Sequence, residues 1–288
     1  MKLLITGCKG QLGTELVRLA TSYEIIAVSH LELDITDASI VDSFIAKARP
    51  EVVINAAAYT AVDRAESDRD LAFSVNCVGP ANLARTCSQL NIPLVHISTD
   101  YVFDGGKKGA YSEDDPIAPL GVYGQSKAAG EQAVREACPE HLILRTSWVF
   151  SAHGTNFVKT MLRLGLERET VRVVADQFGK PTAAAELAHL ILEMLPAADG
   201  RWGTYHLAQP DVTTWHGFAE AIFDEAKHQG MRLKVRQCDA IETSEYPTPA
   251  KRPTNSELDC TKLESTFGIQ IRPWRESLAD VIRELNHG

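Results

Sequence analysis

The sequence predicts an α/β fold, namely a Rossmann-like, doubly wound parallel sheet joined to a smaller C-terminal α/β domain. Through residues 1–150, short apolar runs alternate with segments of helical spacing, which is typical of parallel βαβ units with helices on both faces. A glycine-rich turn joins the first apolar run to the first helical segment. After residue 150 the alternation loosens. We therefore expect residues 151–288 to form mainly the second domain, with residues near 182–208 returning to the first.

The expected strands of the first domain are near-continuous apolar runs, as strands covered on both faces should be. They span residues 2–6, 24–29, 51–55, 93–98 and 141–146. Helical spacing of apolar positions places the intervening helices at residues 15–20, 38–48, 70–90 and 125–137. Asp37 stands directly before the second of these helices and is a candidate N-cap.

The second half of the chain has weaker periodicity. Helices are expected at residues 156–168, 182–195, 215–229 and 273–285, and strands at residues 171–174 and 203–207. The third of these helices places five apolar residues on one face, namely Phe218, Ala219, Ile222, Phe223 and Ala226. Pro247, Pro249 and Pro253 make residues 246–253 extended or turn-like, because proline disfavours helix in itself and in the residue before it.

Charge and composition exclude several classes of protein. The net charge of −9 disfavours binding to nucleic acid or to an anionic membrane. No apolar run reaches the roughly 18 residues of a membrane span, and the first residues enter a strand without a signal-peptide pattern. The six cysteines are scattered, with no CxxC pair. We therefore expect a cytoplasmic protein with reduced cysteines.

The glycine turn predicts a dinucleotide site. Gly7, Gly10 and Gly13 follow the first strand and open a helix, so the backbone can approach a diphosphate at the positive end of that helix. The spacing is GxxGxxG, which is similar to the short-chain dehydrogenase pattern. At the end of the second strand, Ser29 stands where NAD-preferring sites often carry an acid. This neutral residue mildly favours NADPH over NADH, although an acid three or five residues beyond it, Glu32 or Asp34, could reach the ribose or adenine.

A second constellation predicts proton transfer. Thr99 ends the fourth apolar run, and Tyr123 and Lys127 stand four residues apart on one helix face. Ligands of open α/β sheets bind at the carboxyl ends of the strands, so these three side chains can converge beside a nicotinamide. There Lys127 is expected to lower the pKa of Tyr123, so that Tyr123 can act as acid or base.

Seven segments in order over nearly the whole chain carry a resemblance. They are GxxGxxG, NAAAYTAVD (residues 55–63), STDYVFDG (98–105), YGQSK (123–127), RTSWVF (145–150), DQFGKPT (176–182) and KRPTNSELD (251–259). The chain resembles the dTDP-4-dehydrorhamnose reductase family of extended short-chain dehydrogenases. The resemblance implies reduction of a dTDP-linked 4-keto-6-deoxy sugar to dTDP-L-rhamnose, for bacterial surface polysaccharides, with NADPH or NADH.

The same resemblance implies roles for individual residues. Beside the three glycines, the cofactor would contact Gln11, Leu12, Ser29, Asp34, Ile35, Ala58, Tyr59, Thr60, Tyr123 and Lys127. The sugar nucleotide would contact Val62, Thr99, Asp100, Tyr123, Trp148, Phe178 and Arg252. Asn76 would help to fix the central sheet and the strand ends. Trp148 could instead belong only to the core, and Arg252 could instead only hold the proline turn.

Some members of the family bind Mg²⁺ between subunits through glutamates. Glu15 and Glu186 fall at matching places, so a homodimer that shares Mg²⁺ stays open beside the plainer interpretation of exposed, solvated glutamates.

Three other functions stay open. A 4,6-dehydratase is expected to carry an acid directly after Thr-Asp, whereas Tyr101 follows Asp100 here. An epimerase would turn over without net oxidation of its cofactor. A non-catalytic subunit, like the regulatory subunits of methionine adenosyltransferase, would not need the intact set of Thr99, Tyr123 and Lys127.

Overall fold

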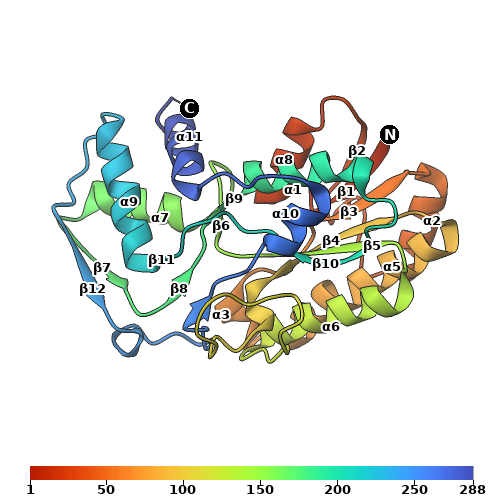
Figure 1. Cartoon of the computed structure of the whole chain (residues 1–288), viewed down its shortest axis with the longest axis horizontal. Helices are drawn as coiled ribbons and strands as arrows, with labels where there is room; N and C mark the ends of the chain where they lie inside the picture. Colours follow the sequence, from red (N-terminus) through yellow and green to blue (C-terminus); the bar gives the residue numbers. More distant parts are fainter. Residues whose placement is uncertain (288) are drawn as a thin grey trace.

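The computed structural model describes residues 1–287. Its centre is a six-stranded parallel sheet in the order β10-β5-β4-β3-β1-β2 (Figure 1). The strands are β1 (Lys2–Thr6), β2 (Glu24–Val28), β3 (Val52–Asn55), β4 (Leu94–Thr99), β5 (His141–Thr146) and β10 (Gly203–His206). The predicted Rossmann-like parallel sheet is thereby confirmed.

Helices cover both faces of this sheet (Figure 1). On one face lie α1 (Gln11–Leu19) and α8 (Ala184–Met194), whose apolar residues pack with Leu3 and Ile5 of β1. On the other lie α2 (Ala38–Ala48), α5 (Gly79–Leu90) and α6 (Val122–Ala137). Leu4, between those two residues of β1, packs with the second face because successive side chains of a strand point to opposite sides.

The expected helix at 70–90 is interrupted. It divides into α4 (Arg69–Phe73), a π-helical turn at Ser74–Val78, and α5, preceded by the short helix α3 (Val62–Ala65). Helix α1 also starts earlier than predicted, at Gln11 directly after Gly10, because glycines lower helical propensity without preventing a helix start. Asp37 caps α2 as predicted, since its carboxylate accepts from the backbone N–H groups of Ser39 and Ile40.

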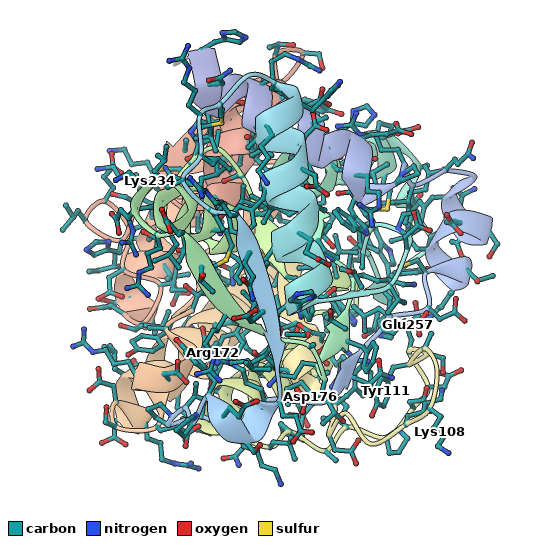
Figure 2. The ribbon with its side chains drawn as sticks, turned by 90° about the vertical axis from the view of Figure 1, so that its left-hand side faces the viewer. Lys108, Tyr111, Arg172, Asp176, Lys234 and Glu257 are labelled. Atoms are coloured by element: carbon teal, nitrogen blue, oxygen red, sulfur yellow. The ribbon has the colours of Figure 1, made fainter. Side chains whose placement is uncertain are left out.

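The second domain has a core of its own, built on α7 (Phe157–Glu167), α9 (Trp215–His228) and α11 (Trp274–His287). These helices lie near β7 (Thr170–Val174) and β12 (Gln237–Ile241), which pair in parallel and stand side by side in Figure 2. Strand β12 was not predicted, because its sequence Gln-Cys-Asp-Ala-Ile lacks strand-like alternation. In Figure 2 Asp176 lies beyond the end of β7, where it accepts from the hydroxyl of Thr243 at 2.6 Å.

Shorter elements connect the two parts. They are β6 (Val149–Phe150), β8 (Phe178–Gly179), β9 (Thr182–Ala183), β11 (Thr213–Thr214), β13 (Asn255–Ser256) and α10 (Thr261–Phe267). The residues 246–253 form neither helix nor strand, as predicted. Strand β10 crosses back to pair with β5, so part of the C-terminal half completes the first sheet. Within residues 1–287, no helix has the length and apolarity needed to cross a membrane.

Candidate active site

Glycine is required at Gly7 and at Gly13 of the first turn for different steric reasons. Gly7 has φ +68°, and a Cβ there would lie 2.6 Å from the backbone nitrogen of Ala57. A Cβ on Gly13 would lie 2.2 Å from the carbonyl oxygen of Gly7, so only glycine lets α1 start this close to the turn. Gly10 is the N-cap of α1 and supplies no side-chain cap. The N–H groups at the start of α1 therefore point out of the turn, as an anionic ligand requires.

The side chains after Gly10 face in different directions. The Gln11 side chain reaches the second domain, where its Oε1 accepts from Ser151 Oγ at 3.0 Å and Asn156 Nδ2 at 2.9 Å. Leu12 is buried in the sheet core. Leu12 can therefore offer a diphosphate only its backbone N–H, whereas Gln11 also ties the cofactor turn to the start of α7.

The carboxylate of Glu32 lies at the end of β2. Both the backbone N–H and the hydroxyl of Ser29 donate to Glu32 at 2.8 Å. These hydrogen bonds, helped by the charge of Lys9, lower the pKa of Glu32. Asp34 is occupied elsewhere, because it accepts from the backbone N–H and the hydroxyl of Thr36. Of the two acids that the sequence pointed to, Glu32 is therefore the one beside Ser29.

The loop after β3 is clamped by one asparagine. Asn76 Oδ1 accepts from Tyr59 N–H at 2.8 Å, and Asn76 Nδ2 donates to Tyr59 O and to Ser126 Oγ, both at 3.0 Å. Asn76 lies fully buried in the π-helical turn, a kind of turn that is frequent at functional sites. It therefore holds residues 58–60, with Ala58 half-buried and Thr60 exposed, against α6.

Thr99, Tyr123 and Lys127 are brought to one place. Thr99 is the last residue of β4, Tyr123 lies in the first turn of α6, and Lys127 follows one turn later. The Thr99 side chain lies near that of Tyr123. Lys127 is 2% exposed, and its Nζ donates to the carbonyl oxygen of Ile97 at 2.6 Å.

Burial sets the protonation of this group. It lowers the pKa of Lys127 to about 8, against the opposing charge of Glu131. It raises the pKa of Tyr123, and the nearby Thr99 hydroxyl only partly offsets that rise. The expected lowering of the Tyr123 pKa by Lys127 is not seen, because burial dominates. Burial therefore keeps Tyr123 in its protonated form, the form that can donate a proton.

Asp100 stands behind this group. It is 2% exposed, and its Oδ1 accepts from Thr99 Oγ1 at 2.9 Å. Its Oδ2 is buried without a hydrogen-bond partner among residues 1–287, with Ser256 of β13 beside the carboxyl group. Burial raises the pKa of Asp100 to about 6, although the nearby hydroxyls of Ser256 and Thr99 oppose the rise.

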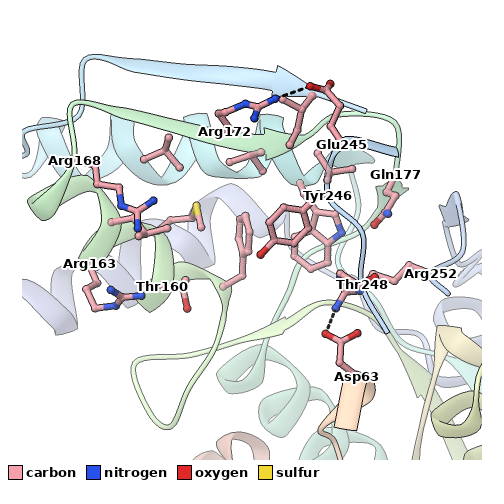
Figure 3. Close-up of a pocket in the computed structure, with 18 of the residues that line it drawn as sticks. Asp63, Thr160, Arg163, Arg168, Arg172, Gln177, Glu245, Tyr246, Thr248 and Arg252 are labelled. Carbon is pink, nitrogen blue, oxygen red and sulfur yellow. Dashed lines mark hydrogen bonds and ion pairs between the residues drawn. The ribbon is translucent and has the colours of Figure 1, made fainter. Parts of the chain in front are cut away.

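A cavity of about 950 Å³ is lined mainly by residues of the C-terminal half of the chain (Figure 3), and Thr99, Tyr123 and Lys127 are not among its lining residues. Tyr101, whose ring meets the Tyr123 ring edge-on at 5.5 Å between centroids, lines the near end. The far end carries arginines of α7 and β7 and the aromatic residues Phe157, Trp215 and Tyr246. Sequence reasoning missed this lining. The only sign of it in the sequence was that these segments contain arginine and aromatic residues, and many other protein surfaces share that composition.

Arg252 faces this cavity. Its guanidinium donates to Oδ2 of Asp63, a residue of the N-terminal half, at 2.8 Å (Figure 3). It also contacts the hydroxyl of Tyr101. Arg252 therefore does more than hold the proline turn. Val62, directly before Asp63, begins α3 at the same edge.

The other two expected sugar contacts are placed differently. Trp148 stacks on Trp215 with 3.6 Å between ring centroids, so it supports the cavity through that residue. Its backbone has φ +46°, and its ring occupies the space beside Gly179, where a Cβ would lie 2.4 Å from the indole. Phe178 lies on β8 with 47% of its surface exposed and is not among the residues that line the cavity. Ile35 is buried against Gly79, at the adenine end of the expected cofactor site.

The two candidate metal ligands are already paired. Glu15 accepts from Arg18 at 2.6 Å, and Glu186 from Arg272 at 2.9 Å. Both carboxylates are buried, so the interpretation as solvated glutamates is wrong. Within residues 1–287, no group of three His, Cys, Asp or Glu side chains could hold a metal ion. The residues of one chain do not fit Mg²⁺, and the homodimer stays a prediction.

Comparisons with known proteins agree with this geometry. The sequence model of the family described as RmlD substrate binding domain matches residues 1–287. The dTDP-4-dehydrorhamnose reductase of Aggregatibacter actinomycetemcomitans is 46% identical over an alignment of 287 positions, which covers 97% of this chain and 98% of the relative. A solved dTDP-4-dehydrorhamnose reductase from Clostridium acetobutylicum superposes with a TM-score of 0.94 and 40% identity, covering 99% of this chain and 100% of that one. The enzyme from Bacillus anthracis, solved in complex with NADP, has a TM-score of 0.93 and 39% identity, covering 98% and 99%.

Proposed function

The chain belongs to the RmlD substrate binding domain family, and on that basis we propose that it reduces the C4 keto group of dTDP-4-dehydro-L-rhamnose to give dTDP-L-rhamnose. The observation that carries the proposal is the placing of Thr99 at the end of β4 and of Tyr123 and Lys127 in the first turns of α6, with the Tyr123 ring against Tyr101, a residue that lines the cavity. The relatives named above support it, because each spans nearly the whole chain and bears the name of this reductase.

The chain's own residues account for the proton side of the reaction. The uncapped start of α1 would hold the diphosphate of a reduced dinucleotide, and the bound cofactor would supply the hydride for the carbonyl carbon. Tyr123, held protonated by burial, gives its proton to the carbonyl oxygen as negative charge develops there. Thr99 orients that oxygen by a hydrogen bond. Lys127 holds the cofactor ribose with its ammonium group.

The cavity suits a sugar nucleotide. Four guanidinium groups line it, those of Arg163, Arg168, Arg172 and Arg252. Arginines bind diphosphates through paired hydrogen bonds, and aromatic rings such as Trp215 and Tyr246 can stack on a pyrimidine. Arg252 would leave Asp63 to bind the diphosphate, and Asp100 would contact the sugar.

For the cofactor we propose that both NADPH and NADH are used, with a mild preference for NADPH. The neutral Ser29 and the nearby Lys9 favour a 2′-phosphate, and the Bacillus anthracis relative holds NADP. The Glu32 carboxylate beside Ser29 keeps the preference mild. Its negative charge repels a 2′-phosphate, and its oxygens can accept a hydrogen bond from a ribose hydroxyl.

The test follows absorbance at 340 nm with NADPH and, separately, with NADH. The 4-keto substrate is generated in the cuvette from dTDP-glucose by the dehydratase and epimerase that make it. Oxidation of cofactor that depends on this protein and yields dTDP-L-rhamnose is the expected result. Folded protein that binds NADPH but oxidises neither cofactor would overturn the proposal, and net epimerisation without oxidation would replace it.

A further inference from the structure

The helix that carries Tyr123 begins without a side-chain cap of its own. Gly121 is the N-cap of α6 and has no side chain that could accept a hydrogen bond, so the first N–H groups of the helix need partners from elsewhere. Glu66 provides one, since its Oε1 accepts from the backbone N–H of Val122 at 2.9 Å. Val122 directly precedes Tyr123, so a residue from a distant part of the chain fixes the backbone beside the proposed acid.

Gly121 leaves the space that the Glu66 carboxylate occupies. A Cβ on Gly121 would lie 2.7 Å from Glu66 Oε1, so a side chain at this position would displace the carboxylate. The backbone of Gly121 has φ −126° and ψ 172°, an extended conformation that other residues adopt readily. Backbone conformation therefore does not require glycine here, whereas the bond from Val122 to Glu66 does.

Tyr101 holds the same turn of α6 through a second contact. A Cβ on Gly124 would lie 2.2 Å from the carbonyl oxygen of Tyr101, so the helix lies tightly against that backbone. The Tyr123 ring meets the Tyr101 ring edge-on at 5.5 Å between centroids. Tyr101 lies directly after β4, whereas Glu66 lies at the end of α3. The place of Tyr123 therefore depends on two separate segments of the first domain.

Helix α3 also contacts the cavity. Glu66 is the C-cap of this short helix, and Asp63 lies within it. Asp63 accepts from Arg252 at 2.8 Å and from the backbone N–H of Ala250 at 3.3 Å, and both Asp63 and Arg252 line the cavity (Figure 3). One turn of chain thus joins the cavity to the start of α6, so the bond from Glu66 sets Tyr123 relative to the place proposed for the sugar nucleotide.

We propose that Glu66 is a positioning residue, which holds the Tyr123 hydroxyl where the carbonyl oxygen of the bound sugar receives its proton. This inference rests on the proposed function, since it concerns the same reduction. Glu66 acts through the backbone of Val122, so its loss should slow turnover and leave the binding of both ligands nearly unchanged. A misplacement of about 1 Å can cost roughly a hundredfold in rate, so the loss of one such bond is measurable.

The first test compares two variants of Glu66. Glu66→Ala removes the acceptor, whereas Glu66→Gln keeps an acceptor oxygen and removes only the charge. In Glu66→Ala kcat should fall roughly tenfold or more, while KM for the sugar nucleotide and Kd for NADPH change by less than about twofold. Glu66→Gln should retain most of the unmodified kcat. Asp70→Ala is the matched control, because its carboxylate is exposed on the neighbouring α4, and it should leave all three constants unchanged.

Two double variants separate positioning from general stability. Gly121→Ala should displace the Glu66 carboxylate and lower kcat as Glu66→Ala does, and the two changes together should cost little more, because both break one bond. In a Tyr123→Phe background Glu66→Ala should also cost little more, because the hydroxyl that Glu66 positions is absent. Thermal unfolding and NADPH titration confirm that each variant is folded. If Glu66→Ala does not fold, Gly121→Ala takes its place in both comparisons.

Three outcomes would overturn the positioning role while leaving the proposed function intact. The first is an unchanged kcat in Glu66→Ala. The second is an equal loss in Glu66→Gln, which would assign the effect to the charge of Glu66 and not to its hydrogen bond. The third is a loss as large in the Tyr123→Phe background as in the unmodified protein, which would make Glu66 only a structural contact. Lack of ketone reduction by the unmodified protein would instead remove the proposed function.

Discussion

Glu131 and Arg145 form a doubly hydrogen-bonded ion pair in the interior, 2.9 Å between Arg145 Nε and Glu131 Oε1 and 2.7 Å between Arg145 Nη2 and Glu131 Oε2. Glu131 is fully buried and Arg145 is 2% exposed. The pair fastens α6 to β5 one turn beyond Lys127, so the helix that carries Tyr123 is held by a buried charge. Removing one partner of such a pair leaves the other as a buried charge that has neither an ion-pair partner nor hydration.

The first prediction follows directly. Glu131→Ala should lower the free energy of unfolding by about 3–5 kcal/mol, because Arg145 would remain buried and unpaired. Glu136→Ala is the matched control on the same helix, since its exposed carboxylate bonds only Gln132. It should change stability by less than about 0.5 kcal/mol. Urea unfolding monitored by circular dichroism measures both, and equal losses would contradict the argument.

The same pair predicts how stability depends on acid. Burial raises the pKa of Glu131, but hydrogen bonds and charge from Arg145, with Ser98 and Arg135, outweigh it and hold the pKa below its ordinary 4.5. The stabilisation should therefore be complete above pH 4.5 and be lost as pH falls through the lower folded value. Acid unfolding followed by tryptophan fluorescence checks this. In Glu131→Gln that part of the pH dependence should be absent.

Tyr123→Phe should reduce turnover roughly a hundredfold or more, the usual contribution of a general acid. NADPH affinity should change little, because the ring and its contact with Tyr101 remain. The measurement is kcat at saturating substrate together with a fluorescence titration of NADPH. Near-normal turnover in a folded variant would remove Tyr123 from its proposed role.

Cofactor affinity should weaken as pH rises through about 8, because burial lowers the pKa of Lys127 to about 8 and the ammonium form binds the ribose. Glu131 opposes that lowering, so Glu131→Gln should move the transition to lower pH. NADPH titrations between pH 6.5 and 9.5 check both shifts. In Lys127→Met the affinity should be low at every pH, and a persisting transition there would assign it to another group.

Substitutions at two glycines of the first turn should affect different properties, thermal stability at Gly13 and cofactor affinity at Gly10. Gly13→Ala should lower the melting temperature, because its Cβ would lie 2.2 Å from the carbonyl oxygen of Gly7. Gly10→Ala meets only that same oxygen, at 3.3 Å, and should melt near the unmodified protein while binding NADPH more weakly. Differential scanning calorimetry and NADPH titration distinguish the two. Equal melting temperatures would show that the turn relaxes around Gly13.

The preference for NADPH over NADH should depend on the charge of Glu32. Glu32→Gln should raise the affinity for NADPH relative to NADH by roughly tenfold, the equivalent of about 1.4 kcal/mol. The reason is that a carboxylate held by Ser29 is replaced by a neutral amide of the same shape. Asp34→Asn is the control, since Asp34 bonds Thr36 instead. An equal change in both variants would point to general electrostatics.

Local patterns were sufficient for much of this protein. The glycine turn, the apolar run of each single strand and the four-residue spacing of Tyr123 and Lys127 each depend only on residues close together in the chain, so they can be predicted from the sequence. The same holds for the Asp37 cap, whose partners are two and three residues away. The expected helix at 70–90 misses its π-helical turn, because that turn is stabilised by Asn76 bonding to Tyr59 and Ser126, far along the chain.

The sequence by itself determined the fold class, the dinucleotide turn and the three residues of the proton-transfer group. Only the tertiary structure decided which acid stands beside Ser29, that Arg252 pairs with Asp63, and that Asp100 is buried with its Oδ1 bonded to Thr99. It also decided the cavity, whose lining comes from α3, α7, β7 and the loop around Tyr246. The physical reason is that burial and long-range pairing set these properties, and both depend on segments that meet only when the chain is folded.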